Sequence, residues 1–291
     1  MTRITLPRRV AAVLAVGALA LSACGNGGEE AAAPEETAAD DSVTTVQEGS
    51  LTMCTHLAYP PFEFADESGE IVGFDVDIAR LTAAQLGLSE QIEVVDVPFE
   101  QVVSGAAFQA RQCDIGIAGM TITEERANAI AFSDPYFNAT QALLAQEGSG
   151  VESLADLQGQ QLGVQATTTG EIYAQEQAEA NGYEIVVFED LPTLANAVLS
   201  GRVAAGINDN GVLFDFARQN PTTQVVEEFD TGEQYGIGAL KDDENAQRIL
   251  EAANEAIATA QDDGTYDELF QRWFGLLPQD PEGDATGAPT N

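Results

Sequence analysis

The chain is poor in positive charge, in histidine and in cysteine, and each shortage argues against a class of function. Its 291 residues hold 11 Lys and Arg against 48 Asp and Glu, so the formal net charge is −37. A surface so anionic repels phosphate backbones, which argues against binding to nucleic acid. One His and three Cys, with no Cys pair at the spacing of metal ligands, argue against a zinc site.

Sequence motifs of common enzymes are also missing. The chain has no Walker A sequence, no dinucleotide-binding glycine pattern and no G-x-S-x-G. We therefore expect no cofactor, no metal and no enzymatic activity. Hydrophobic residues make up 44% of the chain and charged residues 20%, which is a composition that can bury a core.

The N-terminal segment has the pattern of an export signal. Three arginines precede an uncharged run at residues 10–21, which is too short to span a bilayer. The run ends in Leu-Ser-Ala-Cys at residues 21–24, and this resembles the bacterial lipobox, in which the cysteine receives a diacylglycerol. We expect residues 1–23 to be a lipoprotein signal peptide and Cys24 to carry the lipid, palmitate included. The alternative is an ordinary signal peptide with a chance cysteine.

Both ends of the mature chain are polar. Residues 24–48 contain Gly, Ala, Pro, Thr and acids without an apolar period, which is typical of a disordered tether, and residues 278–291 form a similar polar tail. The folded part then covers roughly 49–277. Its many acids repel one another unless salt screens them, which suggests a saline or acidic habitat. The alternative is a solvated acidic surface that prevents aggregation.

Strands and helices alternate along the folded part. We expect strands at 51–55, 92–97, 114–120, 162–165, 183–188 and 204–208. We expect helices at 74–86, 102–110, 170–180, 191–200, 246–261 and 266–274. This alternation predicts an α/β fold with parallel sheets and right-handed crossovers. A ligand of such sheets lies at the carboxyl ends of the strands.

A series of short motifs follows in order along almost all of the folded part. They are YPPFEF at 59–64, GFDVD at 73–77, GMTITEER at 119–126, FSDPY at 132–136, GVQ at 163–165, TTG at 168–170, GRV at 201–203, Asp209, GTY at 264–266 and WFG at 273–275. The ordered set resembles the polar amino-acid solute-binding proteins of bacterial ABC importers, extracellular solute-binding protein family 3.

The resemblance implies a two-lobed periplasmic-binding-protein type II fold. Each lobe is a central, mostly parallel sheet flanked by helices, and two hinge strands join the lobes. We expect the first lobe to comprise 49–142 and 236–277, with the second lobe at 143–235 between them.

The same resemblance implies a monomeric receptor, anchored to the outer face of the cell membrane through Cys24. It would capture a free amino acid, neutral polar or acidic, and deliver it to a membrane permease and its ATPase. One alternative is an enzyme like cyclohexadienyl dehydratase on this scaffold, with Glu63 as the acid. Another is a sensing module of a membrane kinase, which would usually be fused to a transmembrane segment.

The predicted site binds the two charged ends of an amino acid. Arg126 suits the carboxylate, because a guanidinium offers two parallel donors at carboxylate spacing. By resemblance, Gly119 and Thr121 help to hold the same carboxylate. The alternative for Arg126 is an ion pair with Glu124 or another acid on the surface.

Asp209 follows the strand expected at 204–208 and suits the ligand ammonium. Its alternative role is to cap a helix N-terminus, which Asp favours. By resemblance, Thr168 and Thr169 hold the ligand carboxylate from the second lobe. Their alternative is also capping, of the helix that starts near Gly170.

Tyr59 and Phe99 match the aromatic walls of the family, which sandwich the aliphatic part of the ligand. His56 stands where many relatives carry an Asp that contacts the ligand side chain, and this exchange argues against Lys or Arg as ligand. The alternative for His56 is a hydrogen-bonded structural residue. Thr167 occupies a position that is usually Gly.

Cys54 and Cys113 are the two thiols left after lipidation of Cys24. Both belong to strands that we place side by side, and the compartment is oxidising, so a disulfide is one reading. Two small buried hydrophobic residues are the other.

Overall fold

The structure is a computed structural model that describes residues 43–275. The predicted signal peptide 1–23, Cys24, most of the tether and the tail 278–291 lie outside the described residues. Within the described range, no helix is both long and apolar enough to cross a membrane.

The first sheet has the strand order β4-β1-β5-β12-β6. Its strands are β1 (Ser50–Thr55), β4 (Ser89–Asp96), β5 (Ile115–Gly116), β6 (Ala131–Phe132) and β12 (Gly238–Ala239). Strand β1 pairs in parallel with β4 and β5, and β12 is antiparallel to β5 and β6. The helices connected to this sheet are α1 (Phe74–Gln85), α2 (Phe99–Val103), α3 (Ala106–Gln109), α4 (Glu124–Ala129), α8 (Glu244–Asp263) and α9 (Thr265–Phe274), and a hairpin is formed by β2 (Phe64–Ala65) and β3 (Ile71–Val72).

The second sheet has the order β11-β7-β10-β8-β9. Its strands are β7 (Phe137–Gln146), β8 (Gln161–Gln165), β9 (Glu184–Phe188), β10 (Ala205–Asp209) and β11 (Thr223–Tyr235). Strand β8 is parallel to β9 and β10, whereas β7 is antiparallel to β10 and β11. Its helices are η1 (Leu154–Leu157), α5 (Thr169–Asn181), α6 (Leu191–Leu199) and α7 (Asn210–Gln219).

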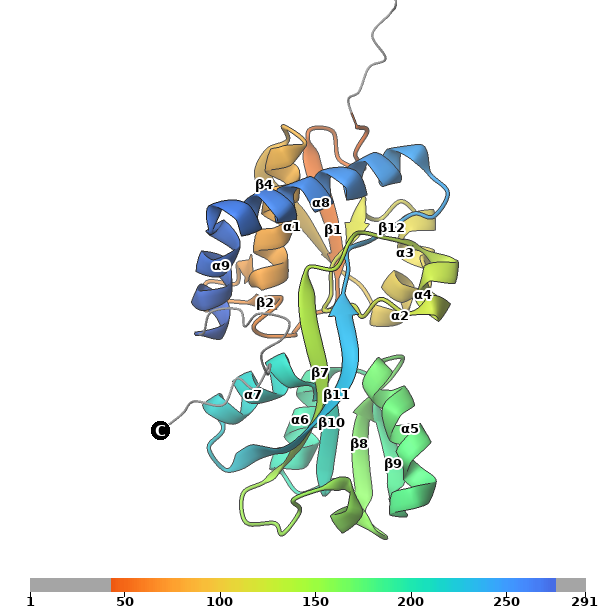
Figure 1. The fold of residues 1–291 in the computed structure, drawn as a ribbon, viewed down its shortest axis with the longest axis vertical. Helices are drawn as coiled ribbons and strands as arrows, with labels where there is room; N and C mark the ends of the chain where they lie inside the picture. The colour runs from red at the N-terminus through yellow and green to blue at the C-terminus, as the bar shows by residue number, and fades with distance from the viewer. Residues whose placement is uncertain (1–42, 276–291) are drawn as a thin grey trace, which may run out of the picture. The chain divides into compact units, whose positions relative to one another are not determined.

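Two strands carry the chain between the sheets. Strands β7 and β11 run side by side, from the pair Phe137 and Tyr235 to the pair Gln146 and Thr223 (Figure 1). Strand β7 follows β6 of the first sheet, and β11 leads back to β12 of the same sheet. The expected α/β architecture of two sheets joined by two hinge strands is therefore confirmed.

Most expected elements are present, and two are wrong in extent. The strand expected at 114–120 is only Ile115–Gly116, because the chain turns at Gly119, whose φ is 53° and whose N–H donates to Asp75 Oδ2. The helix expected at 102–110 is broken into α2 and α3 at Gly105, which has a φ of 76°. The left-handed backbone at these two residues favours glycine.

An aromatic cluster fixes the loop after β1 to the rest of the core. The Phe62 ring lies 5.0 Å from Phe137, 5.4 Å from Tyr235 and 5.2 Å from Phe274, measured between ring centroids. Phe62 is fully buried, and the cluster joins this loop to both hinge strands and to the C-terminal helix. Edge-to-face contacts at such distances stabilise a core beyond the area that they bury.

Two contacts tie the segment before β1 to the first sheet. The N–H of Val46 donates to Asp114 Oδ1, and Thr44 exchanges two hydrogen bonds with Asn245 on α8. The ordered part therefore begins before residue 49, within the last residues that composition assigned to the tether. Cys54 on β1 and Cys113, just before β5, form a disulfide with their Cα atoms 5.5 Å apart.

Candidate functional site

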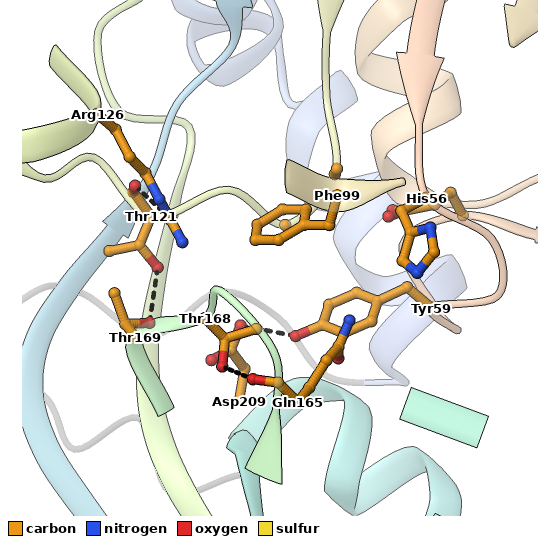
Figure 2. A pocket seen from close by; sticks show the side chains of 12 residues that line it. His56, Tyr59, Phe99, Thr121, Arg126, Gln165, Thr168, Thr169 and Asp209 are labelled. Atoms are coloured by element: carbon orange, nitrogen blue, oxygen red, sulfur yellow. Dashed lines mark hydrogen bonds between the residues drawn. The ribbon is translucent and has the colours of Figure 1, made fainter. Parts of the chain in front are cut away.

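One cavity brings together all the ligand-binding residues predicted from the sequence (Figure 2). It encloses about 330 Å³ of space not filled by atoms, counting the space at its mouth. It is lined by His56, Tyr59, Glu63, Phe99, Ala118, Gly119, Thr121, Arg126, Gln165, Thr168, Thr169 and Asp209.

Strand ends position these side chains. His56 and Tyr59 follow β1, Gly119 follows β5, and Gln165 and Asp209 are the last residues of β8 and β10. Strand β1 is parallel to β5, and β8 is parallel to β10, so the carboxyl ends of each pair meet at one edge of their sheet. This is the usual ligand position of such sheets.

Arg126 is a buried guanidinium that faces carbonyls instead of acids. Its side chain donates to the carbonyl of Thr121 at 2.8 Å and to that of Thr167 at 3.1 Å, and it lies 5.2 Å from the ring centroid of Phe99. No carboxylate of the described residues lies within ion-pair distance of it, so the alternative of a surface pair with Glu124 is not observed. Burial lowers the pKa of Arg126, and the nearby carboxylates of Asp209 and Glu233 oppose that shift.

One of the two carbonyls that accept from Arg126 belongs to Thr167, whose backbone geometry is unusual. Thr167 has a φ of 62°, a conformation that a β-branched residue rarely adopts. Its N–H donates to Glu171 Oε2 on α5, while its carbonyl accepts from the guanidinium. The loop is thus fixed on both sides, although Thr replaces the Gly that the resemblance leads one to expect.

Asp209 directs its carboxylate into the site and does not cap α7. It accepts hydrogen bonds from Tyr59 at 2.8 Å, from Tyr235 at 2.5 Å and from the Gln141 amide. Burial, and secondly the negative charge of Glu233, raise the pKa of Asp209 to about 6. The donors that hold the Asp209 carboxylate are all neutral, so its negative charge has no cationic partner within ion-pair distance among the described residues.

Glu233 is a site residue that the sequence reasoning missed. It comes from β11, and its carboxylate accepts from Thr121 and from Thr169, each at 2.7 Å, and from Gln141 at 3.0 Å. Glu233 lies in a strand that was not expected, and no spacing in the sequence connects it to the other site residues. The pairing of β11 with β7 and the bridge between Tyr235 and Thr121 bring Glu233 next to two threonines that line the cavity.

The two threonines at the start of α5 behave differently. The hydroxyl of Thr168 accepts from the Glu171 N–H at 3.1 Å and donates to the Gln165 carbonyl at 2.8 Å. Thr168 therefore caps the helix, as its alternative interpretation held. Thr169 points instead to Glu233, and it stands 3.5 Å from the hydroxyl of Thr121.

Aromatic rings border the space between Arg126 and Asp209 (Figure 2). Tyr59, which follows β1, and Phe99, the first residue of α2, are both buried and line the cavity. A Cβ at Gly119 would approach the Tyr59 ring to 2.8 Å, so this close packing requires glycine.

Two buried acids lie at the cavity: Glu63 lines it, and Asp75 contacts Gly119, which also lines it. Asp75 accepts from the Gly119 N–H at 2.9 Å and from Tyr136 at 2.8 Å, and burial raises its pKa to about 6. Burial, and secondly Asp75, raise the pKa of Glu63 well above its usual range. Neither carboxyl oxygen of Glu63 has a geometrically sound hydrogen bond among the described residues. The same part of the chain contains no cluster of His, Cys, Asp and Glu able to hold a metal ion.

The chain is similar to known proteins over most of its length. The sequence profile of the bacterial extracellular solute-binding proteins, family 3, matches residues 51–276. The chain is 31% identical over 271 residues to the probable histidine-binding protein of Neisseria gonorrhoeae, covering 91% of this chain and 94% of that one. It is 31% identical over 267 residues to the ABC transporter glutamine-binding protein GlnH of Bacillus subtilis (strain 168), covering 90% and 93%.

Among solved structures, the chain is similar to an ancestral arginine-binding protein bound to arginine. The two share 38% sequence identity with a TM-score of 0.71, and the match covers 78% of this chain and 99% of that one.

Proposed function

The chain belongs to the bacterial extracellular solute-binding proteins of family 3, and from this premise we propose that it captures a free amino acid for an ABC importer. The observation that carries the proposal is the cavity in which Arg126 and Asp209 face the same space (Figure 2). The relatives named above are binding proteins for amino acids, which supports the same class of ligand.

Arg126 binds the α-carboxylate of the ligand. A guanidinium has five N–H donors in a planar fork, and two of them are engaged by carbonyls of the described residues. The carbonyls hold the group in place without neutralising it. An entering carboxylate accepts two parallel charge-assisted hydrogen bonds and supplies the missing negative charge.

Asp209 binds the α-ammonium. A carboxylate has about four lone-pair sites, and Tyr59, Tyr235 and Gln141 occupy three of them. The fourth remains for the ligand. Because Asp209 is buried and its pKa is raised, a cation beside it stabilises the ionised form.

The two charged groups come from different sheets, and the ligand connects them. Arg126 lies on α4, which is connected to the first sheet, and Asp209 ends β10 of the second. A zwitterion bound to both stabilises the arrangement in which the two groups face each other. Such closure requires that the ligand bind that arrangement more tightly than the open one. Tyr59 and Phe99 bury the aliphatic part of the ligand between them.

The test of this site is Arg126→Ala, with Arg248→Ala on the exposed face of α8 as the matched control. We expect Arg126→Ala to abolish amino-acid binding in a calorimetric titration, while circular dichroism remains that of the wild type. Arg248→Ala should bind like the wild type, which separates loss of the site from loss of general positive charge. If Arg126→Ala binds its amino acid as tightly as wild type, the assignment is wrong.

We further propose that the protein is a lipoprotein monomer anchored through Cys24 at the outer face of the membrane, where it meets the permease. Replacement of Cys24 by Ala should then move the protein from the membrane fraction to the medium.

The same cavity could serve a dehydratase if Glu63 acted as an acid. Turnover of prephenate or arogenate by the purified protein would favour that enzyme, and we expect none.

A further inference from the structure

His56 presents a hydrogen-bond acceptor to the cavity. Its Nδ1 lies 3.0 Å from the carbonyl oxygen of Val97. A carbonyl can only accept, so Nδ1 must carry the proton, and Nε2 of the neutral imidazole keeps its lone pair. This Nε2 is buried and has no hydrogen-bond partner among the described residues.

Gln165 presents a donor, and its orientation follows from its neighbours. The backbone N–H of Asp209 donates to the Asn208 side chain at 2.8 Å, so the atom that it meets must be the amide oxygen of Asn208. The Asn208 nitrogen then faces Gln165 and donates to its Oε1 at 3.0 Å. The side-chain oxygen of Gln165 is therefore already hydrogen-bonded, and its side-chain NH₂ group is left to donate to a ligand in the cavity.

The two groups face the same space from opposite sides. Figure 2 shows the amide nitrogen of Gln165 pointing toward His56, and the lower ring nitrogen of His56 pointing back toward Gln165. Both residues line the cavity that also holds Arg126 and Asp209. Arg126 and Asp209 hold the two charged ends of the ligand. The ligand side chain therefore meets one acceptor, Nε2 of His56, and one donor, the NH₂ group of Gln165.

We propose that this site selects an amino acid whose side chain ends in a primary amide, namely glutamine or asparagine. The amide NH₂ donates to Nε2 of His56, and the amide oxygen accepts from Gln165. This inference rests on the proposed function, because Arg126 and Asp209 must first hold the α-carboxylate and the α-ammonium.

Charged side chains leave one of the two groups unmatched. A carboxylate accepts from Gln165 but places a second lone pair against His56. A guanidinium or ammonium donates to His56 but faces the NH₂ of Gln165 with another donor. A buried polar group without its partner loses binding free energy, so such sites reject the wrong ligand strongly. Serine and threonine can both donate and accept through one oxygen, and they are the neutral competitors to be tested.

The first experiment is calorimetric titration of the wild-type protein at pH 8. The ligands are Gln, Asn, Glu, Asp, Arg, Lys, Ser, Thr and Met. We expect at least one amide to bind tenfold or more tightly than every other ligand. Binding of an acidic, basic or hydroxyl amino acid as tightly as the better amide would overturn the inference.

The second experiment replaces the donor by an apolar side chain of similar length, Gln165→Met. We expect glutamine or asparagine to bind at least tenfold more weakly, while the affinity for methionine stays the same or rises. The ratio of the two affinities is the readout, because a merely structural defect would weaken both ligands together. Gln109→Met, at an exposed position on α3, is the matched control and should leave the ratio unchanged.

The outcomes separate the two proposals. If Arg126→Ala abolishes binding but the amide-to-methionine ratio does not change in Gln165→Met, the amide selection is wrong and the proposed function stands. If no amino acid binds the wild type, the proposed function itself fails. Thermal unfolding of each variant verifies that it is folded before its ratio is interpreted.

Discussion

Asp209 links ligand binding to pH at the scale of a single residue. Its pKa is raised to about 6, first by burial and then by Glu233, with Tyr59, Tyr235 and Gln141 opposing the shift through hydrogen bonds. Near or below pH 6 a fraction of the ligand-free protein therefore carries a protonated Asp209. The ligand ammonium requires the ionised form, so binding must expel that proton.

We predict that amino-acid affinity is constant from pH 7 to 8 and falls below about pH 6, by up to tenfold for each pH unit. The sign follows from the raised pKa, because protons compete with the ammonium for the same carboxylate. Calorimetric titrations in buffers of different ionisation enthalpy measure the linkage directly. They should show release of part of a proton at pH 6 and none at pH 8.

Asp75 is the control, because burial raises its pKa to about 6 as well. Asp75 is not among the residues that line the cavity, and it contacts Gly119 and Tyr136, not the proposed ammonium position. The isosteric variant Asp75→Asn should keep the proton release at pH 6. Loss of the release in that variant would assign the pH dependence to Asp75 and contradict the role of Asp209.

The sequence could predict site residues that lie within recognisable motifs. Arg126 closes the motif at 119–126 and lies on α4, and Asp209 is the last residue of β10, so the resemblance of these motifs to the family was enough to select both. Gln141 meets Asp209 because β7 pairs with β10, where the two residues stand opposite each other. Glu233 reaches Gln141 because β11 pairs with β7, and both pairings join residues far apart in the sequence. The spacing of residues along a short stretch of sequence does not predict contacts between strands that are far apart in the chain.

At the scale of elements, the regular alternation was predictable, and the resemblance implied two hinge strands, but no local pattern showed where the hinge strands lie in the sequence. Helices such as α1 and α8 carry apolar residues at helical spacing, which is a local pattern. Strand β11 instead carries several acids and has two register shifts in its pairing with β7. Its sequence therefore lacks the apolar alternation by which strands are predicted.

The disulfide between Cys54 and Cys113 joins β1 to the start of β5, and we predict that it stabilises the first sheet. The two cysteines are 59 residues apart in sequence. By the loop-closure relation, cross-linking a loop of this length removes unfolded-state entropy worth about 4 kcal/mol. A reductant should therefore lower the melting temperature of the ligand-free protein.

The double variant Cys54→Ala/Cys113→Ala provides the control for the reductant. It should melt at a lower temperature than the oxidised wild type and should not respond to the reductant at all. Mass spectrometry verifies the state of the thiols in each sample. An unchanged melting temperature in wild-type protein whose thiols are shown to be reduced would contradict the prediction.

At the scale of the whole molecule, charge opposes folding. The full chain has a formal net charge of −37, and the described residues form only four ion pairs between an arginine and a carboxylate within 4.0 Å. Most acids therefore have no basic partner and repel one another across the surface. The repulsion acts over roughly the Debye length, which is about 30 Å at 0.01 M salt and about 3 Å at 1 M.

We predict that salt raises the melting temperature of the ligand-free protein, with the steepest rise below about 0.15 M, where the Debye length shortens to about 8 Å. For a chain of this size, each kcal/mol of repulsion that is screened raises the melting temperature by about 2–4 °C. Sodium and potassium chloride at equal ionic strength should act alike, because screening depends on ion charge. A curve that is flat in both salts would mean that the acids are too far apart to repel, and that the acidic surface serves solubility alone.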